Sequence, residues 1–411
     1  MKMKGIYFDL KMWKIILSKL RLAPKFLTIN YKDNWAIPKI THNSHVLVKT
    51  LNAGICGSDI HQIDLDMSYY ASVLSSPLNP SPIGHEVVGI VEKTSKNSSL
   101  KKGDRVVLNP TAHCASYGFT PCPSCQKGDW QHCYTLVGTG DNSERESSFK
   151  PFKGQIYGGF TEYFLAFEKN LYKVPENVPN YVAVLTEPFT VALHAVMRNK
   201  PSDTDSIIII GAGTIGLMTI VAIRTLGIKS KITSIARYSH QAELAKQLGA
   251  DTVLTSSGDK EKLYITIADM HNSLLVTPLM RKSYLYGTRG PDIIFDSVGS
   301  QTTINDAFHL IRSGGTIIVM GMGYSITKNV DWAIQIYKEV TLTGTFLQSI
   351  GEVDGKVVDP YELALDFMAN HGTLFEQFVT HRYPIDEYKK AFATLEDKAR
   401  TQAIKVIFDY T

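Results

Sequence analysis

Residues 207–216 read IIIIGAGTIG, and this stretch decides the fold. Its isoleucine run predicts a buried strand, and the glycines that follow are spaced G-x-G-x-x-G at the point where a helix should begin. Gly211 permits a sharp turn, Gly213 lets the backbone approach a pyrophosphate, and Gly216 allows the helix to pack closely on the strand. The stretch therefore predicts a dinucleotide site whose phosphates face the N-terminus of the helix.

The sequence on the two sides of residue 190 differs in character. After it, apolar runs that predict buried strands alternate with helical patterns, which favours a parallel sheet covered on both faces. Before it, apolar runs alternate with Gly, Pro, Asn and Ser clusters, so this part should be mostly β. The expected strands after residue 190 are 207–210, 232–236, 252–254, 293–296, 316–320, 341–345 and a final one at 403–408. The expected helices are 191–196, 241–248, 303–311, 361–370 and 385–395.

The residues after the second expected strand bear on the cofactor. An acidic side chain that binds the adenosine ribose is expected about 20 residues after the glycines. The sequence there reads ITSIARYSHQ and has no carboxylate before Glu243. Arg237 follows the expected position, and its guanidinium could bond a 2′-phosphate, so we favour NADP over NAD; a solvated charge at the strand end is the alternative. The candidate cofactor-binding residues are Gly211, Gly213, Thr214, Ile215, Gly216, Arg237, Val298 and Gly299.

Length and composition exclude several classes of protein. The 411 residues suggest two or three domains, and 44% hydrophobic with 20% charged residues are typical of a soluble globular chain. A net charge of +4 without a block of like charge argues against nucleic-acid binding. Lysines interrupt the apolar N-terminus and glycines divide the uncharged stretch 206–223, so we expect neither a secretory leader nor a membrane span. We therefore expect a soluble, cytoplasmic protein.

Four of the five cysteines crowd onto one short segment. Four thiolates on a single loop suit a closed, tetrahedral zinc that holds irregular backbone together, and incidental free thiols are the alternative. In a large chain this clustering favours a reducing compartment. The cysteines are Cys114, Cys122, Cys125 and Cys133.

The fifth cysteine stands apart, in a second group of residues that could bind metal. Cys56 lies in GICGSDIH, His85 and Glu86 lie in GHE, and Glu187 lies in TEP. One thiolate, one imidazole and one or two carboxylates from distant segments are typical of a zinc site that keeps a position open for water or substrate. Each residue alone also has a structural interpretation, as a core thiol, a hydrogen-bonded histidine or a charge at a helix N-terminus.

These motifs occur together with others over nearly the whole chain: GICGSDIH, GHE, KGDRVV, EPFTVALHAV, IIIIGAGTIG, IIFDSVGS and the cysteine loop. In this combination the sequence resembles the zinc-dependent medium-chain alcohol dehydrogenase superfamily, and most of all its polyol, threonine and sugar dehydrogenase branch. The resemblance implies an α/β chain with a mostly-β GroES-like catalytic domain at 1–190 that carries both zinc sites. A Rossmann-type doubly wound parallel sheet at 191–345 would bind the dinucleotide, and residues 346–411 would return to the catalytic domain.

Carried over residue by residue, the resemblance implies two zinc ions per chain. Cys56, His85 and Glu86 would bind the catalytic zinc. Glu187 would be a fourth ligand or would hold the metal-bound water. The structural zinc would be held by Cys114, Cys122, Cys125 and Cys133.

The resemblance also assigns three residues of GICGSDIH to catalysis. Ser58 and His61 match the proton relay of the family. Asp59 would orient the zinc-bound His85 as a hydrogen-bond partner behind the metal.

The sequence departs from the family pattern in three places. Phe119 stands where the first structural thiolate is usual, so Cys114 must take that role across a loop five residues longer. Ser95 replaces a usual glycine. Residues 262–289 form a long insert between two expected strands, and the sequence suggests no function for it.

The function that these residues predict is hydride exchange between a nicotinamide cofactor, with NADP favoured, and a hydroxyl-bearing small molecule. The substrate would be an alcohol, a polyol or a sugar, and a sugar (aldose) or threonine dehydrogenase of the same superfamily is the alternative. A zinc-stabilised nucleotide-binding protein without turnover is the alternative from another class. We expect no nucleic-acid or membrane partner, and by analogy with the family we expect a homo-oligomer.

Overall fold

The computed structural model describes residues 2–9, 11–20, 22, 25–41, 43–65, 81–95, 97–137, 158–255, 258–323 and 329–411. The chain divides into two compact units. Unit 1 comprises residues 1–190, 347–350 and 357–411, and unit 2 comprises residues 191–346 and 351–356. No helix in the described residues is long and apolar enough to cross a membrane.

Unit 2 is built on a six-stranded parallel sheet with the order β11-β10-β9-β14-β15-β16. From the central strand β9 the chain adds β10 and β11 on one side, and from β14 it adds β15 and β16 on the other. This is the doubly wound order of Rossmann folds. The expected Rossmann-type sheet is therefore confirmed. The strands are β9 (Ser206–Ile210), β10 (Lys231–Ala236), β11 (Thr252–Thr255), β14 (Ile293–Asp296), β15 (Thr316–Val319) and β16 (Thr341–Gly344).

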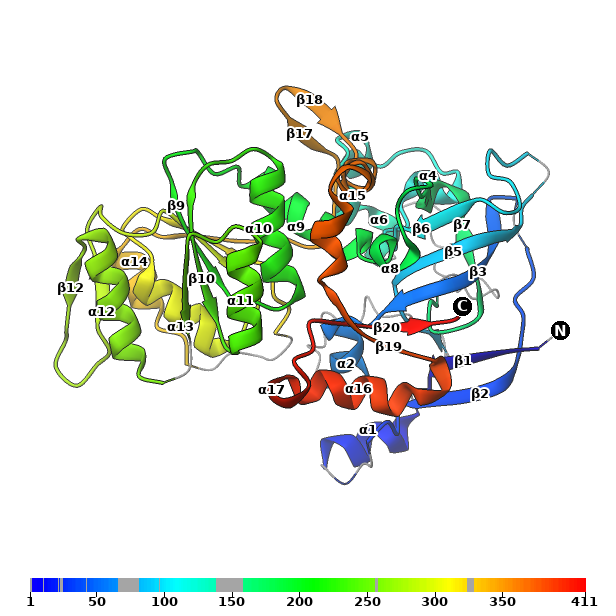
Figure 1. Cartoon of the computed structure of the whole chain (residues 1–411), viewed down its shortest axis with the longest axis horizontal. Coiled ribbons are helices and arrows are strands. Elements are labelled where there is room, and N and C mark those ends of the chain that lie inside the picture. The colour runs from blue at the N-terminus through cyan, green and yellow to red at the C-terminus, as the bar shows by residue number, and fades with distance from the viewer. Residues whose placement is uncertain are drawn as a thin grey trace. The chain divides into compact units, whose positions relative to one another are not determined.

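Helices cover both faces of this sheet, as Figure 1 shows. The isoleucines of β9 alternate between the two faces because successive strand side chains point in opposite directions. Ile208 and Ile210 pack with Tyr264 of α12 and Phe308 of α13 in one buried cluster. The helices are α10 (Thr214–Thr225), α11 (Ser239–Gln247), α12 (Lys260–His271), α13 (Gln301–Leu310) and α14 (Trp332–Tyr337).

The insert at 262–289 contains most of α12 and a two-stranded antiparallel hairpin. The hairpin consists of β12 (Leu274–Val276) and β13 (Tyr284–Tyr286). His309 of α13 fastens it, because its Nδ1 lies 2.7 Å from the carbonyl oxygen of Ser283. A second hairpin is formed by β17 (Gly351–Val353) and β18 (Lys356–Val358).

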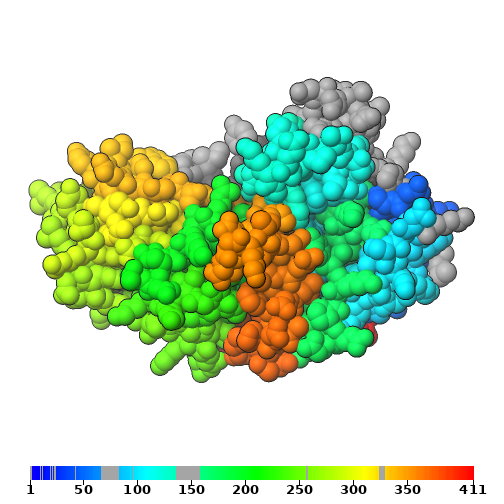
Figure 2. Space-filling model, turned by 90° about the horizontal axis from the view of Figure 1, so that it is seen from above, coloured from blue at the N-terminus to red at the C-terminus, as the bar shows by residue number. Residues whose placement is uncertain are grey.

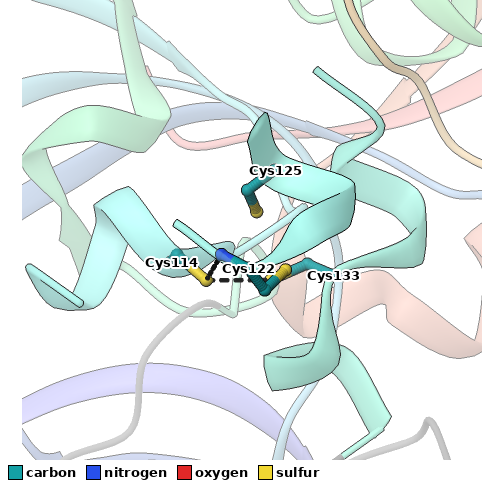
Figure 3. Close-up of side chains that lie close together, drawn as sticks. All are labelled: Cys114, Cys122, Cys125 and Cys133. Carbon is teal, nitrogen blue, oxygen red and sulfur yellow. Dashed lines mark hydrogen bonds between the residues drawn. The ribbon is translucent and has the colours of Figure 1, made fainter. Parts of the chain in front are cut away.

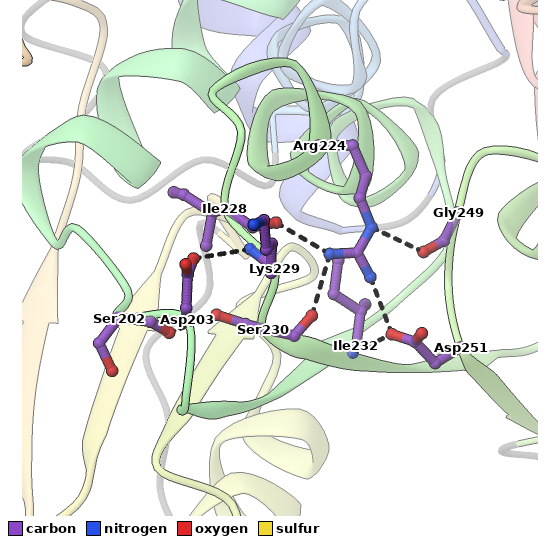
Figure 4. A network of polar contacts seen from close by, with 9 residues as sticks. All are labelled: Ser202, Asp203, Arg224, Ile228, Lys229, Ser230, Ile232, Gly249 and Asp251. Atoms are coloured by element: carbon purple, nitrogen blue, oxygen red, sulfur yellow. Dashed lines mark hydrogen bonds and ion pairs between the residues drawn. The ribbon is translucent and has the colours of Figure 1, made fainter.

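Arg224 connects the C-terminal end of α10 to the sheet (Figure 4). Its guanidinium donates hydrogen bonds of 2.9–3.0 Å to the carbonyl oxygens of residues 228, 230 and 249. It also donates to the carboxylate of Asp251 at 2.8 Å. The same carboxylate oxygen accepts from the N–H of Ile232 at 2.7 Å, so one cation organises the loops that lead into β10 and β11.

Unit 1 contains a seven-stranded sheet in which the last strand of the chain pairs with the third. The sheet runs β19-β20-β3-β5-β6-β8, and β7 also pairs with β3. The antiparallel register of β20 and β3 places Ile407 opposite Gly54 and Asp409 opposite Asn52. The strands are β3 (His45–Gly54), β5 (Glu86–Lys93), β6 (Arg105–Leu108), β7 (Tyr163–Phe167), β8 (Leu171–Lys173), β19 (Val379–Tyr383) and β20 (Lys405–Asp409).

A smaller sheet of three strands and several short helices complete unit 1. The sheet has the order β2-β1-β4, with β1 (Lys2–Phe8), β2 (Ile29–Ala36) and β4 (Ser81–Pro82). Buried residues from both sheets, such as Ile6, Val48, Val91 and Phe408, form one core. The helices are α1 (Met12–Lys19), α2 (Gly57–Asp64), α4 (Cys114–Tyr117), α5 (Pro123–Gln126), α6 (Tyr134–Val137), α8 (Asn180–Ala183), α15 (Pro360–Glu376), α16 (Tyr388–Glu396) and α17 (Lys398–Thr401). Helix α9 (Thr186–Arg198) begins in unit 1 and continues into unit 2.

Replacing Arg224 with Met should lower the free energy of unfolding by about 2–4 kcal/mol, because three partly buried carbonyl groups and Asp251 would lose a charged donor. Urea denaturation followed by circular dichroism measures the change. Arg289→Met is the matched control, since Arg289 is exposed. Equal stabilities of the two variants would contradict the structural role of Arg224.

Candidate active site and metal centres

The end of β3 and the start of α2 form the first wall of the candidate active site. Cys56 lies at the N-terminal cap of α2. The N–H of Cys56 donates to Oδ2 of Asp59 at 2.9 Å, and this hydrogen bond fixes the first turn of the helix. Asp59 is buried, and its second oxygen lies 3.6 Å from Nδ1 of His85. One carboxylate therefore contacts both the backbone of Cys56 and the imidazole of His85.

Glu86 is the first residue of β5 and His85 directly precedes it, and both meet Cys56 there. One ligand atom from each of Cys56, His85 and Glu86 lies within 4.8 Å of the others. Burial lowers the pKa of His85, but Asp59 and Cys56 together raise that pKa well above the ordinary value. A thiolate, an imidazole and a carboxylate at this spacing fit the donor set of a zinc site with an open position.

Lys405 is a member of the site that sequence reasoning missed. Its Nζ lies 2.7 Å from both carboxylate oxygens of Glu86, and both side chains are almost completely buried. Burial lowers the pKa of Lys405, but Glu86, together with Cys56 and Glu187, raises it above the ordinary value. The available signal was a lone lysine in AIKVIF, an otherwise apolar final strand.

Gly54 leaves the space that Glu86 occupies. A Cβ atom at this position would overlap Oε2 of Glu86. The glycine is therefore required by the close approach of a carboxylate to the backbone of β3.

Glu187 lies in the first turn of α9 and is buried. Burial raises its pKa to about 7, with His85 and Lys405 opposing that shift and Glu86 adding to it. Within the described part of the chain, the compact group of ligand atoms consists of Cys56, His85 and Glu86, and Glu187 is not a member of it.

Ser58 and His61 both lie on α2 and are half-buried. Residues three apart are neighbours on one helix face, so the two side chains follow one another along α2. Their position directly after Cys56 is compatible with the expected proton relay.

The four cysteines of the other cluster converge as expected (Figure 3). Their sulfur atoms all lie within 4.8 Å of one another, and none forms a disulfide. The sulfur of Cys133 lies 3.6 Å from that of Cys114 and 3.9 Å from that of Cys122. This arrangement fits a closed tetrahedral metal site.

The longer loop after Cys114 is accommodated by a single helical turn. Helix α4 begins at Cys114 and ends at Tyr117, and Gly118 caps it with a φ of +72°, in the left-handed region that glycine favours. The N–H of Phe119 then donates to the carbonyl oxygen of Cys114 at 2.9 Å, and the phenyl ring packs against the sulfur cluster. Phe119 therefore replaces a thiolate with an apolar contact, and Cys114 reaches the cluster from one turn earlier. The cysteine segment forms a continuous turquoise part of the surface of unit 1 in Figure 2.

The glycine motif of unit 2 lies between β9 and α10. Gly211 adopts a φ of +90°, and a Cβ there would collide with the side chain of Val298. No atom lies within 4 Å of a Cβ built on Gly213, so the space in front of this residue is open. Asp296 holds the neighbouring turn, because its Oδ1 accepts from the N–H groups of Val298 and Gly299 at 3.0 Å. The remaining candidates at the motif are Thr214, Ile215 and Gly216, the first residues of α10.

Arg237 follows the end of β10 and is exposed. Its guanidinium carbon lies 5.5 Å from the centre of the Tyr238 ring. A cation therefore follows the carboxyl end of β10, and the sequence has no carboxylate between it and Glu243.

Comparisons with known proteins agree with this geometry. A model of the alcohol dehydrogenase GroES-like domain matches residues 42–176, and a model of the zinc-binding dehydrogenase family matches residues 214–370. Together the two models match more than half of the chain.

Full-length relatives extend the match. An L-threonine 3-dehydrogenase from Paraburkholderia phymatum is 28% identical over 397 residues, covering 96% of this chain and 99% of the relative. A D-xylulose reductase from Saccharomyces cerevisiae is 27% identical over 368 residues, covering 87% and 89%. The solved structure of an alcohol dehydrogenase from a Thermus species has a TM-score of 0.72 at 22% identity and covers 100% of both chains.

The fold, the two groups of possible metal ligands and the family models all point to one class of protein. These are the zinc-binding dehydrogenases built from a GroES-like and a Rossmann-type unit. The chain belongs to the zinc-dependent medium-chain alcohol dehydrogenase superfamily.

Lys405→Met should lower the free energy of unfolding by about 3–5 kcal/mol, because it leaves the buried Glu86 carboxylate without its partner. Lys405→Arg should recover part of this loss. Chemical denaturation of the purified variants measures both effects. The control is Lys390→Met, which removes an exposed ion pair with Glu387 and should leave stability nearly unchanged. A Lys405→Met protein as stable as the control would contradict the proposed importance of the buried pair.

Proposed function

We propose that this chain is a zinc- and nicotinamide-dependent dehydrogenase that oxidises a hydroxyl group of a small molecule or reduces the corresponding carbonyl. The observation that carries the proposal is the convergence of Cys56, His85 and Glu86 in a member of this superfamily. The chain is an oxidoreductase acting on CH–OH groups, as its family membership indicates. A protein that only binds nucleotide has no need of an open metal site.

Cys56, His85 and Glu86 would hold the catalytic zinc, and Glu187 would be a fourth ligand or hold a water molecule. When bound, zinc supplies Lewis-acid stabilisation of the negative charge that develops on the substrate oxygen. Asp59 keeps His85 oriented from behind, and Lys405 neutralises part of the negative charge of the donor set.

The chain's own residues would move the hydroxyl proton. Ser58 would accept it from the substrate, and His61, one turn further along α2, would pass it towards solvent. The nicotinamide carries the redox chemistry, so the protein has to position the reacting carbon and exclude water.

A second zinc would be structural. Cys114, Cys122, Cys125 and Cys133 offer four thiolates and no open position, which suits a closed site. The segment has a small apolar cluster made of the sulfurs and Phe119, so a metal would supply much of its local stability.

NADP is the cofactor that we favour. The support is the exposed guanidinium of Arg237 and the absence of a carboxylate before Glu243 in the sequence after β10. The substrate class that we propose is a polyol, a sugar or an amino alcohol such as threonine, in line with the names of the two full-length relatives. We also propose a homo-oligomer, by analogy with the superfamily.

Metal analysis of matched cysteine variants tests the two zinc sites. The unmodified protein should contain about two zinc ions per chain, and Cys56→Ala and Cys125→Ala should each retain about one. Cys56→Ala should lose turnover but still bind NADPH, because the glycine motif is intact. A change in NADPH fluorescence on addition of the protein measures this binding. Turnover by Cys56→Ala would refute the catalytic site. The unmodified protein is also tested on a panel of alcohols, polyols and sugars. If it binds the cofactor normally but turns over none of them, the alternative of a binding protein without activity is favoured.

Arg237→Asp tests the cofactor preference. The ratio of kcat/KM with NADPH to kcat/KM with NADH should fall by at least about tenfold, since a charge-assisted hydrogen bond becomes a repulsion. Steady-state kinetics with both cofactors measures the ratio. Arg281→Asp, an exposed charge reversal on the insert hairpin, should leave the ratio unchanged. An equal ratio in the two variants would contradict the NADP proposal.

A further inference from the structure

The tip of the hairpin in the 262–289 insert carries two apolar side chains that face water. Leu279 and Met280 are 91% and 93% exposed, more than any other large apolar side chain in the described residues. They lie between the two strands of the hairpin, β12 and β13, and β12 lies at the margin of unit 2 in Figure 1. The pair is therefore available to a partner of the chain.

The backbone holds this pair at the apex of a tight turn. The N–H of Arg281 donates to the carbonyl oxygen of Pro278 at 3.3 Å, which closes a four-residue turn around Leu279 and Met280. Met280 adopts a φ of +58°, a conformation for which such turns usually have glycine. A large side chain there is uncommon and strains the backbone, and burial of the side chain does not offset the strain. The chain thus keeps an exposed apolar side chain at a position that disfavours one.

The base of the hairpin is anchored, which holds the tip in place. Ser283 is completely buried, and its Oγ lies 2.8 Å from Oγ1 of Thr277 across the hairpin. The carbonyl oxygen of Ser283 lies 2.7 Å from Nδ1 of His309, and Leu285 is buried in the core of unit 2. A tip on an anchored base loses little conformational freedom when it binds a partner.

Two cations directly follow the apolar pair. Arg281 and Lys282 are exposed, and neither forms an ion pair with the residues that the structure describes. The sequence has no aspartate or glutamate between residues 270 and 291. Glu261 of α12 reaches the hairpin, but its carboxylate accepts from the N–H of Ser283 at 3.3 Å. An apolar tip accompanied by free cations is complementary to a surface that is apolar beneath an anionic layer.

The size of this feature favours a lipid surface over a protein partner. A stable protein–protein interface covers about 800 Å² on each side, and two apolar side chains that protrude at a turn offer far less. A bilayer needs no complementary groove, because its lipids rearrange around an inserted side chain and their phosphates attract cations over a broad area.

We propose that the tip of the insert hairpin docks on anionic lipid bilayers. Leu279 and Met280 would enter the boundary between headgroups and acyl chains, and Arg281 and Lys282 would contact lipid phosphates. Two apolar and two cationic side chains give shallow, reversible association. The proposal departs from the sequence-based expectation of no membrane partner, and it is independent of the proposed dehydrogenase function.

Vesicle flotation of the full chain at low ionic strength tests the proposal. The probes are vesicles of phosphatidylcholine alone and of phosphatidylcholine mixed with phosphatidylglycerol. The unmodified protein should float with the anionic vesicles, remain behind with the neutral ones and dissociate as salt is raised. Leu279→Ser/Met280→Ser should partition at least about tenfold less, and Arg281→Gln/Lys282→Gln at least about fivefold less.

The matched control removes an exposed apolar pair from the same unit. Ile336 and Tyr337 of α14 are 71% and 76% exposed. The lysine that follows them, Lys338, is buried and donates to the carbonyl oxygen of Phe308 at 2.7 Å, so its charge is not available to lipid. Ile336→Ser/Tyr337→Ser should float as the unmodified protein does. Equal flotation of the tip variants and this control would overturn the proposal, as would equal binding of the unmodified protein to both kinds of vesicle or binding to neither.

Leu279→Trp reports insertion of the tip directly. Tryptophan is favoured at the bilayer interface, so this variant should bind the anionic vesicles at least as well as the unmodified protein. The difference in fluorescence emission between the two proteins should shift to shorter wavelengths when vesicles are added. A difference spectrum that vesicles leave unchanged would contradict insertion.

Light scattering distinguishes a second copy of the chain as the occupant of the tip. Leu279→Ser/Met280→Ser should have the same molar mass in solution as the unmodified protein. A fall in mass confined to this variant would show that another copy covers the tip and would overturn the lipid proposal.

Discussion

The ion pair between Lys405 and Glu86 is the interaction on which the candidate active site depends. Both groups are removed from water, and each compensates the buried charge of the other. The pairing of β20 with β3 brings them together, because its register places Ile407 opposite Gly54, beside Cys56. Lys405 also donates to the carbonyl oxygen of Ile55 at 3.2 Å. Completing the sheet of unit 1 and assembling the donor set are therefore one structural event.

The two proposed metal sites in unit 1 are positioned by different means. Cys56, His85 and Glu86 are held by strand ends, a helix cap and a buried cation, so their geometry is largely set by the fold. The four-cysteine segment consists of short turns around the sulfurs, against which Phe119 packs. We therefore expect metal removal to disturb the cysteine loop more than the candidate active site, since a loop without a core depends on its ligand for order.

The turns at the carboxyl edge of the sheet in unit 2 are also held by local backbone geometry and hydrogen bonds. Gly211 adopts a left-handed conformation, and Asp296 accepts the N–H groups of Val298 and Gly299. The glycine conformation and the hydrogen bonds of Asp296 fix the backbone of these turns and leave the space in front of Gly213 open. Arg224, at the opposite end of α10, fixes the same helix to the loops before β10 and β11. The helix whose N-terminus would face the phosphates is thus anchored at its C-terminal end.

The sequence by itself determined the doubly wound sheet, the glycine turn and the residue types of both proposed metal sites. These depend on local patterns, such as the isoleucine run of β9 and the spacing of Cys122 and Cys125, which short-range geometry fixes. Only the tertiary structure placed Lys405 beside Glu86 and required glycine at position 54. Those features depend on contacts between segments far apart in the chain, and no local pattern encodes which distant strand will pair with which. The sequence of the final strand is the same whether its lysine faces water or a carboxylate. Only the register of β20 on β3 determines that Lys405 faces Glu86.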